Sequence, residues 1–362
     1  MSLAVDVMGG DDAPDAILKG CVDAIEHLDA DDQLILVGDE AVISETLTER
    51  GISDPRLVIH HAADVIAMDE SPARAVRAKT NSSIVQMALL GSRKADDPVD
   101  AVLSAGNTGA CVSAAIMHLK RLPGVHRPGI AVTIPALAGP LVLCDAGANP
   151  EPKAAHLWQY GVMADVHARH ALGIERPRVA LLNIGSEEGK GSDLVRNTAA
   201  LLKATPDLNY IGYIEGRDFF DGAADVVITD GFVGNTVLKM AQGLAKSLFT
   251  AIAHEIFQHD PQLAVQFEPV VKGIYAKNDY HEYGGAPLLG VNGNCMIAHG
   301  SSQPRTIAAA VRNTKAHVAA GTNAHIQKRI AEVAHLEHGA TASATAESRP
   351  TAQRTQAQQE HA

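Results

Sequence analysis

The sequence has few aromatic residues and no long apolar run. Only 4% of its 362 residues are Phe, Trp or Tyr, although 46% are hydrophobic. No segment approaches the roughly 20 apolar residues that a membrane-spanning helix needs. The first residues also lack the basic start and apolar stretch of a signal peptide. We therefore expect a cytoplasmic protein with a large aliphatic core.

Positive charge and cysteine are also scarce. The 30 Lys and Arg residues are outnumbered by 42 Asp and Glu, which gives a net charge of −12. Such a balance argues against a nucleic-acid partner, because phosphate contacts need a basic surface. The histidine and cysteine spacings do not match those of metal ligands, so no metal is predicted. Four cysteines, scattered in apolar contexts, are predicted to be reduced core thiols: Cys21, Cys111, Cys144 and Cys295.

Short runs of Val, Leu and Ile alternate with helix-length amphipathic stretches. This rhythm predicts an α/β fold of parallel strands joined by crossover helices, and the chain is long enough for two α/β lobes. A first strand is expected over residues 3–7, then a helix capped by Asp12, with Pro14 in its first turn, that reaches about His27. Further strands are expected over residues 34–37, 57–59, 99–103, 130–134, 141–144, 179–183, 210–214 and 226–229. Residues 339–362 are rich in Ala, Thr, Ser, Gln and Glu, which predicts a disordered tail after a folded region of residues 1–338.

A glycine-rich loop follows the first predicted strand and opens a helix. In open α/β sheets ligands bind beyond the carboxyl ends of the strands, so such loops are the places to look for chemistry. Tandem glycines let the backbone approach a ligand at a helix N-terminus, and a plain strand-to-helix turn is the alternative. The candidate binding residues of this loop are Gly9, Gly10 and Asp11.

A second loop of small and polar residues covers positions 104–110. Its glycines leave room for an anion, and its backbone N–H groups and polar side chains can donate to phosphate oxygens. It lacks the P-loop lysine and the spacing of a dinucleotide-binding loop, and a polar turn remains the alternative. Its candidate residues are Gly106, Asn107, Thr108 and Gly109.

A third segment, residues 68–83, carries clustered positive charge. Arg74 and Arg77 lie three apart and so share one face of a predicted helix, and Ser82 and Ser83 open the next helix. This pattern fits a phosphate clamp or a docking patch for an acidic carrier. A solvated helix face is the ordinary alternative.

Two later loops also follow buried-looking strands and precede helices. They cover residues 182–191 and 229–236, and Asn183, Lys190, Asp230, Gly234 and Asn235 are their candidate site residues. We expect these side chains to converge on one cleft between the lobes. Near the end of the chain, the dense glycines of residues 284–290 lead to His299 and Ser301, which line a pocket or form tight turns.

Taken in order, these segments resemble the bacterial phosphate acyltransferases that act on acyl-acyl carrier protein. The matching pieces are residues 6–11, 68–83, 104–110, 127–128, 145–149, 177–185, 229–235 with 238–239, and 284–302. Departures include Ile84, where Met is usual, and Gly129, where Ala is usual. The resemblance implies a two-lobed, three-layer α/β/α fold related to phosphotransacetylases and isocitrate-type dehydrogenases.

The same resemblance implies transfer of a long-chain fatty acyl group to inorganic phosphate. The product would be an acyl phosphate for phosphatidic acid and phospholipid synthesis, made by a homodimer without metal or organic cofactor. The product would pass to a membrane glycerol-3-phosphate acyltransferase. The acidic carrier suggests five cations as docking residues: Arg74, Arg77, Lys120, Arg121 and Arg127.

Acyl transfer to phosphate is mainly a positioning problem. Phosphate is already an anionic nucleophile, so the enzyme has only to hold it beside the thioester and stabilise the oxyanion that forms. We expect Asn107, Thr108 and Gly109 to cradle phosphate, helped by Ser82, Ser83 or Lys190. The carboxamides of Asn183 and Asn235 are expected to donate to the oxyanion or to phosphate.

Two other readings of the whole chain remain open, together with the role of one helix. A dehydrogenase of the related fold would need a nicotinamide cofactor and a cluster of metal-binding aspartates. A non-catalytic scaffold would not need polar glycine-rich loops at strand ends. The stretch 237–257 is amphipathic, which favours core or dimer packing, with a peripheral membrane contact that includes the region of Phe267 as the alternative.

Overall fold

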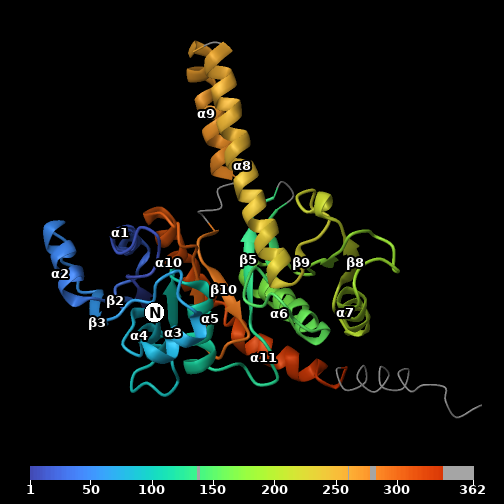
Figure 1. The fold of residues 1–362 in the computed structure, drawn as a ribbon, viewed down its shortest axis with the longest axis horizontal. Coiled ribbons are helices and arrows are strands. Elements are labelled where there is room, and N and C mark those ends of the chain that lie inside the picture. Colours follow the sequence, from blue (N-terminus) through green and yellow to red (C-terminus); the bar gives the residue numbers. More distant parts are fainter. Residues whose placement is uncertain (137–138, 260, 278–282, 337–362) are drawn as a thin grey trace, which may run out of the picture.

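A computed structural model describes residues 1–136, 139–259, 261–277 and 283–336. Eleven strands in these ranges form one sheet in the order β3-β2-β1-β4-β11-β10-β5-β6-β9-β7-β8 (Figure 1). The predicted tail over residues 339–362 lies outside the described residues. The strands are β1 (Ser2–Asp6), β2 (Gln33–Gly38), β3 (Leu57–His61), β4 (Ala101–Ser104), β5 (Gly129–Ile134), β6 (Leu141–Cys144), β7 (Val179–Leu182), β8 (Tyr210–Ile214), β9 (Val226–Ile228), β10 (Ala286–Leu289) and β11 (Asn294–Ile297).

The sheet is mixed, so the prediction of parallel strands is confirmed within each half of the sheet and wrong between the halves. Strands β3, β2, β1, β4 and β11 are parallel to one another, as are β6, β9, β7 and β8. Between these two halves, β10 is antiparallel to β11 and β5, and β5 is antiparallel to β6. The physical reason is loop length: β5–β6 and β10–β11 are joined by short connections, which cannot make a parallel crossover.

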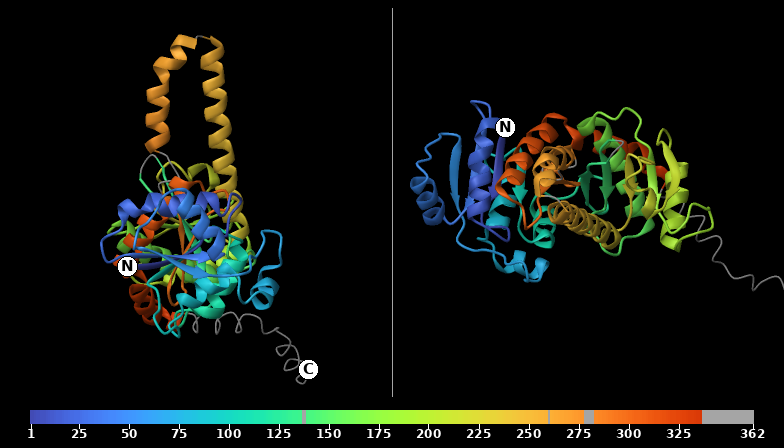
Figure 2. Two further views of the ribbon diagram at one scale, coloured as in Figure 1. Left: turned by 90° about the vertical axis from the view of Figure 1, so that its left-hand side faces the viewer. Right: turned by 90° about the horizontal axis from the view of Figure 1, so that it is seen from above.

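Helices cover both faces of the sheet, which gives three layers (Figure 2). On one face α1 packs against α10, and α6 packs against α7 and α11, while α3, α4 and α5 pack together on the other. The helices are α1 (Asp15–Asp23), α2 (Glu40–Glu49), α3 (Pro72–Ala78), α4 (Ser83–Leu90), α5 (Thr108–His118), α6 (Ala154–Leu172), α7 (Asp193–Ala204), α8 (Gly231–His259), α9 (Pro261–Lys277), α10 (Pro304–Ala319) and α11 (Thr322–Val333), with 3₁₀ turns at Ala24–His27 and Gly216–Asp218.

The first helix begins later than the sequence predicted. Pro14, not Asp12, occupies the N-cap position, and Asp12 contributes only its carbonyl oxygen, which accepts from the Ala16 N–H at 3.0 Å. The fixed φ of proline suits this position, where no N–H is required. The 3₁₀ turn that follows α1 ends at His27, where the helix was expected to stop.

Helices α8 and α9 form a hairpin that projects from the body of the molecule (Figures 1 and 2). The predicted amphipathic stretch 237–257 lies inside α8, whereas a second helix had not been predicted. Every fourth residue of part of α8 is apolar and exposed: Met240, Leu244, Leu248 and Ile252. No helix in the described part of the chain is both long and apolar enough to span a bilayer.

The core is aliphatic, as the composition indicated. Trp158 and Tyr160 of α6 are the largest fully buried side chains, and most of the other core residues are Leu, Ile, Val and Ala. All four cysteines are buried and unpaired, which confirms the prediction of core thiols. The division into two lobes stays a prediction.

Candidate functional site

The loops that follow β1 and β4 are joined by a buried carboxylate. Asp6 ends β1 and accepts from the Ser104 hydroxyl at 2.7 Å, and the Ser104 oxygen in turn accepts from the Gly106 N–H at 3.0 Å. A Cβ atom at Gly9 would lie only 2.8 Å from Gly106 Cα, so glycine is required for this approach. Burial raises the pKa of Asp6, and hydrogen bonding from the serines beside it offsets part of the rise.

Asn107 occupies the N-cap position of α5, and its side chain is fully used. The carboxamide oxygen accepts from the Ala110 N–H at 3.1 Å. Its nitrogen donates to the carbonyls of Ala67, Met68 and Glu70 at 3.2, 3.2 and 3.3 Å. The predicted phosphate donor therefore fixes the 67–70 segment over the start of α5, and the anion-binding capacity left here belongs to the first helical N–H groups at Thr108 and Gly109.

The two serines at the start of α4 lie beneath this region. Ser82 is the N-cap residue and Ser83 the first helical residue, as the sequence predicted. Both hydroxyls are buried, and neither makes a hydrogen bond of normal geometry with a described residue. Ser83 nevertheless acts on Asp6, whose pKa its hydroxyl lowers against the larger effect of burial. The side chain of Ile84 lies 3.1 Å from the place where a Gly106 Cβ would be, so this helix start packs directly under the turn.

The segment after β11 completes this first loop group, which we define as residues 8–11, 104–109 and 298–302. The Asp11 N–H donates to the Gly300 carbonyl at 2.8 Å, and His299 Nδ1 lies 2.8 Å from the Ser301 hydroxyl. Partial burial lowers the pKa of His299, the positive charge of Lys239 lowers it further, and Asp11 acts in the opposite direction. The group thus contains most of the predicted substrate-binding residues.

A second loop group, residues 145–149, 183–191 and 229–235, is organised by another buried carboxylate. Asp145 follows β6 and accepts from the N–H groups of Ile130, Gly147, Ala148 and Asn149 at 2.6 to 3.2 Å. Burial raises its pKa, and these backbone donors oppose the rise. A Cβ at Gly234 would overlap the Asp145 carbonyl oxygen, so the start of α8 is pressed onto this loop.

The remaining predicted residues of the second loop group have local partners. Asn183 is buried, and its amide donates to the carbonyls of Gly185 and Lys190 at 3.0 and 3.3 Å. Lys190 is exposed, and Asp230 caps α8 by accepting from the Val233 N–H at 2.8 Å. Asn235 is half-buried beside Gly147. Asn235 and Lys190 are therefore the members whose side chains could still meet a ligand.

The two loop groups follow strands that run in opposite directions. Because β10 and β5 reverse the direction between the halves, the carboxyl end of β4 and that of β9 point away from each other. Helix α8 starts in the second group. One cleft shared by Asn107 and Asn235 stays a prediction.

The predicted docking cations fall into two sets. Arg74 and Arg77 are exposed on α3, which packs against the start of α5. Lys120 and Arg121 are exposed just after the end of α5, and Arg127 precedes β5. An 11-residue helix is about 16 Å long, so these sets are separated by roughly that distance along α5.

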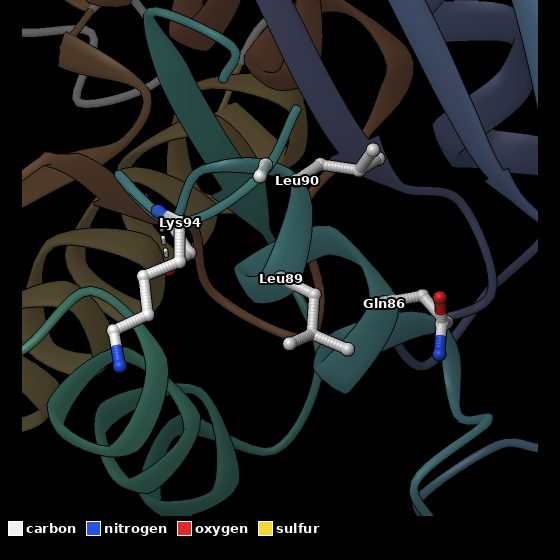
Figure 3. Close-up of a pocket in the computed structure, with 6 residues that line it drawn as sticks. Gln86, Leu89, Leu90 and Lys94 are labelled. Carbon is white, nitrogen blue, oxygen red and sulfur yellow. Dashed lines mark hydrogen bonds between the residues drawn. The ribbon is translucent and has the colours of Figure 1, made fainter. Parts of the chain in front are cut away.

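Two hollows in the structure lie away from both loop groups. One, of about 240 Å³, is lined by Gln86, Leu89, Leu90, Ser92, Lys94 and Ala95 at the end of α4 (Figure 3). The other, of about 220 Å³, lies between α6 and α11. Neither contains a predicted site residue. Within the described ranges, no group of three or more His, Cys, Asp or Glu residues is placed to hold a metal ion.

The sequence reasoning missed the residues that hold the loops in place. Asp6 and Asp145 were part of the matching segments but were not assigned a role, and Ser104 was not singled out. A usable signal existed, because each aspartate ends an apolar strand and directly precedes a glycine-rich loop. A buried carboxylate at that position can satisfy several backbone N–H groups of the following turn.

The fold matches that of the phosphotransacetylases. A phosphotransacetylase from Streptococcus pyogenes superposes with a TM-score of 0.60 at 18% identity, covering 88% of this chain and 94% of that one. The EutD phosphotransacetylase from Staphylococcus aureus gives a TM-score of 0.56 at 15% identity with the same coverage. These likenesses confirm the predicted phosphotransacetylase-like α/β fold.

Sequence comparison defines the family more closely. The model of a family described as "Fatty acid synthesis protein" matches residues 1–325. The phosphate acyltransferase of Bacillus licheniformis is 41% identical over 337 residues, 92% of this chain and 99% of the relative. That of a Desulfitobacterium hafniense strain is 45% identical over 333 residues, 91% and 98% of the two chains. The chain belongs to the phosphate acyltransferase family and is an acyltransferase.

Proposed function

We propose that the protein transfers a long-chain fatty acyl group from acyl-acyl carrier protein to inorganic phosphate. The acyl phosphate would serve phosphatidic acid and phospholipid synthesis. Family membership over residues 1–325 supports the reaction class. The observation that carries the proposal is the first loop group, in which the first backbone N–H groups of α5, at Thr108 and Gly109, have no acceptor within the helix and can donate to an anion.

The site supports direct attack by phosphate on the thioester carbon. A phosphate oxygen forms the new bond to the acyl carbon, and the carrier thiolate leaves with the electron pair of the C–S bond. Helix N-terminal N–H groups at Thr108 and Gly109 would hold phosphate, and Ser82 and Ser83 provide hydroxyls without complete partners. Among the described residues, no cysteine is exposed as a nucleophile, since all four are buried.

The direct test supplies acyl-acyl carrier protein and inorganic phosphate to the purified protein. We expect phosphate-dependent release of the carrier thiol and an acyl phosphate that hydroxylamine traps. The buried cysteines of the enzyme will add little background to a thiol reagent. Equal thioester loss with and without phosphate would contradict the proposal.

Docking of the acidic carrier is proposed at Arg74 and Arg77, which are exposed beside the start of α5. Electrostatic steering weakens as salt screens the charges, so the KM for the carrier substrate should rise with ionic strength. Arg74→Glu should raise it several-fold at low salt. Arg217→Glu, an exposed arginine in the other half of the sheet, is the matched control and should leave it unchanged.

The projecting hairpin supports a homodimer, a second part of the proposal. An exposed apolar stripe on α8 gains free energy when a second copy covers it. The double variant Leu244→Glu, Leu248→Glu should turn a dimer into a monomer in light scattering, and Ser247→Glu on the same helix should not. A monomeric wild-type protein would refute this part.

Peripheral membrane contact by the same hairpin is the alternative role, for a cytoplasmic protein that passes its product to a membrane glycerol-3-phosphate acyltransferase. Flotation with liposomes separates the two roles. If the glutamate variants stay dimeric but no longer float, the stripe serves the membrane; if they become monomers, it serves the dimer.

A further inference from the structure

The turn after β11 holds the ring of His299 by one of its two nitrogens. The Ser301 backbone N–H donates to Nδ1 of His299 at 3.2 Å, and the Ser301 hydroxyl lies 2.8 Å from the same atom. Because a backbone N–H can only donate, Nδ1 must accept and cannot carry a hydrogen. The neutral ring therefore has its hydrogen on Nε2.

The same contacts keep the ring neutral. Protonation of His299 would put an Nδ1–H group against the Ser301 N–H, and two donors that face each other repel. Partial burial acts in the same direction and lowers the pKa of His299. The ring is thus a neutral imidazole with one N–H group to offer.

That N–H group is unused, and the turn that carries it is anchored in the first loop group. The side chain of His299 reaches solvent, and its Nε2 makes no hydrogen bond with any residue that the structure describes. The Ala298 N–H donates to the Ser104 carbonyl at 2.9 Å, and the Asp11 N–H donates to the Gly300 carbonyl at 2.8 Å. The ring is therefore a fixed donor among the loops that follow β4 and β1.

We propose that His299 is a catalytic residue that donates a hydrogen bond from Nε2–H to the thioester carbonyl oxygen as phosphate attacks. The inference rests on the proposed acyl transfer. Negative charge grows on that oxygen while the new C–O bond forms, so a donor fixed beforehand lowers the barrier without binding the substrates more tightly. The hydrogen stays on Nε2, and the imidazole is unchanged when the carrier thiolate leaves.

The charge of Asp11 favours the carbonyl over phosphate as the acceptor. A Cβ atom at Gly300 would lie 3.0 Å from the Asp11 carboxylate, so this carboxylate borders the turn that carries His299. It would repel a phosphate dianion at rest beside the ring, whereas a thioester carbonyl is neutral before the attack.

Ser301 offers a rival mechanism, because a hydroxyl 2.8 Å from an imidazole nitrogen is also the arrangement of an activated nucleophile. In that arrangement a third group orients the base, and no described residue binds Nε2 of His299. The two mechanisms differ in what the Ser301 side chain does. If His299 is the donor, the Ser301 backbone N–H still holds the ring after the hydroxyl is removed.

Matched variants separate the two mechanisms in the phosphate-dependent assay. His299→Ala should lower kcat about 10²–10³-fold. It should change the KM for phosphate less than about twofold. Ser301→Ala should keep kcat within about tenfold of the wild type, since only one hydrogen bond to the ring is lost. His299→Gln returns an N–H donor and should recover part of the loss. His335→Ala, at an exposed histidine after α11, is the control and should keep the wild-type kcat.

Three kinetic outcomes would overturn the assignment. The first is a wild-type kcat in His299→Ala, and the second is a KM for phosphate that rises in that variant while kcat holds. The third is a loss in Ser301→Ala as large as in His299→Ala, which would make the serine the nucleophile. A wild-type protein without phosphate-dependent thioester loss sinks the proposed reaction instead.

The position of the hydrogen on the ring can be read without turnover. In wild-type protein with isotope-labelled histidine, the nitrogen NMR signals of His299 at neutral pH should show the hydrogen on Nε2 and none on Nδ1. A hydrogen on Nδ1 would overturn the inference even if every variant behaved as expected.

Discussion

Asn107 illustrates what a residue type and position can and cannot tell. The sequence placed it in a turn between an apolar strand and a helix, and the structure has it there, as the N-cap of α5. Its four hydrogen bonds to the backbone could not be foreseen, because three of the partners lie about 40 positions earlier in the chain. The pattern thus located the turn but not the use of its side chain.

We predict that Asn107→Asp lowers both the stability of the protein and the rate of acyl transfer. The carboxylate can still accept from Ala110, but it faces three carbonyl oxygens that have lost their donor. Loss of buried partners of this kind costs about 1–3 kcal/mol, which urea denaturation would measure. Asn235→Ala is the comparison, since Asn235 is half-buried. Unfolding free energies equal to wild type in Asn107→Asp would show that the side chain is free for substrate.

At the scale of elements, nine strands could be predicted close to their observed bounds and two could not. Strands β10 and β11 carry a proline, an asparagine and flanking glycines, which are typical of turns. They form within the sheet because both their faces are covered by the core, with Leu288, Leu289 and Met296 buried. Missing them also hid the change of strand direction between the two halves of the sheet.

Two glycines of α8 provide a matched test of how this helix is seated. In Gly234→Ala the new methyl group would overlap the backbone carbonyl of Asp145, which cannot rotate away. We expect a loss of about 1–3 kcal/mol in the free energy of unfolding, and lower acyl-phosphate formation. In Gly243→Ala no described atom lies within 4 Å of the new methyl group. Because alanine loses less backbone entropy than glycine when the helix forms, this change should stabilise the protein by about 0.5–1 kcal/mol. Chemical denaturation of both variants measures these two opposite changes in the free energy of unfolding. Equal changes would mean that α8 does not press on the Asp145 loop.

At the scale of the whole molecule, a buried histidine pair joins the two halves of the sheet. His167 belongs to α6, which packs on β6 and β9, and His317 belongs to α10, which packs on β4 and β11. The ring centroids are 5.6 Å apart, and neither Nδ1 has a hydrogen-bond partner among the described residues. Burial lowers the pKa of His167 to about 3, with a further contribution from His317, and burial lowers that of His317 to about 4.

These pKa values give the stability of the molecule a defined pH dependence. In the unfolded chain both histidines take up protons near pH 6.5, whereas in the folded protein they remain neutral until about pH 4 or below. Their contribution is therefore complete above pH 6.5 and is lost as the pH falls toward the folded values. Acidification from pH 7.5 to pH 5.5 should lower the free energy of unfolding by about 1 kcal/mol for each of the two histidines. His317→Gln should remove its share of that loss in urea titrations at the two pH values, while His335→Gln, at an exposed position, should keep the wild-type dependence. If His317→Gln loses as much stability as the wild type on acidification, protonation of this histidine pair is not the cause of the loss. Asp6 and Asp145 cannot be the cause either. Their pKa values are raised in the folded protein, so the folded state binds more protons than the unfolded chain and these two groups favour folding as the pH falls.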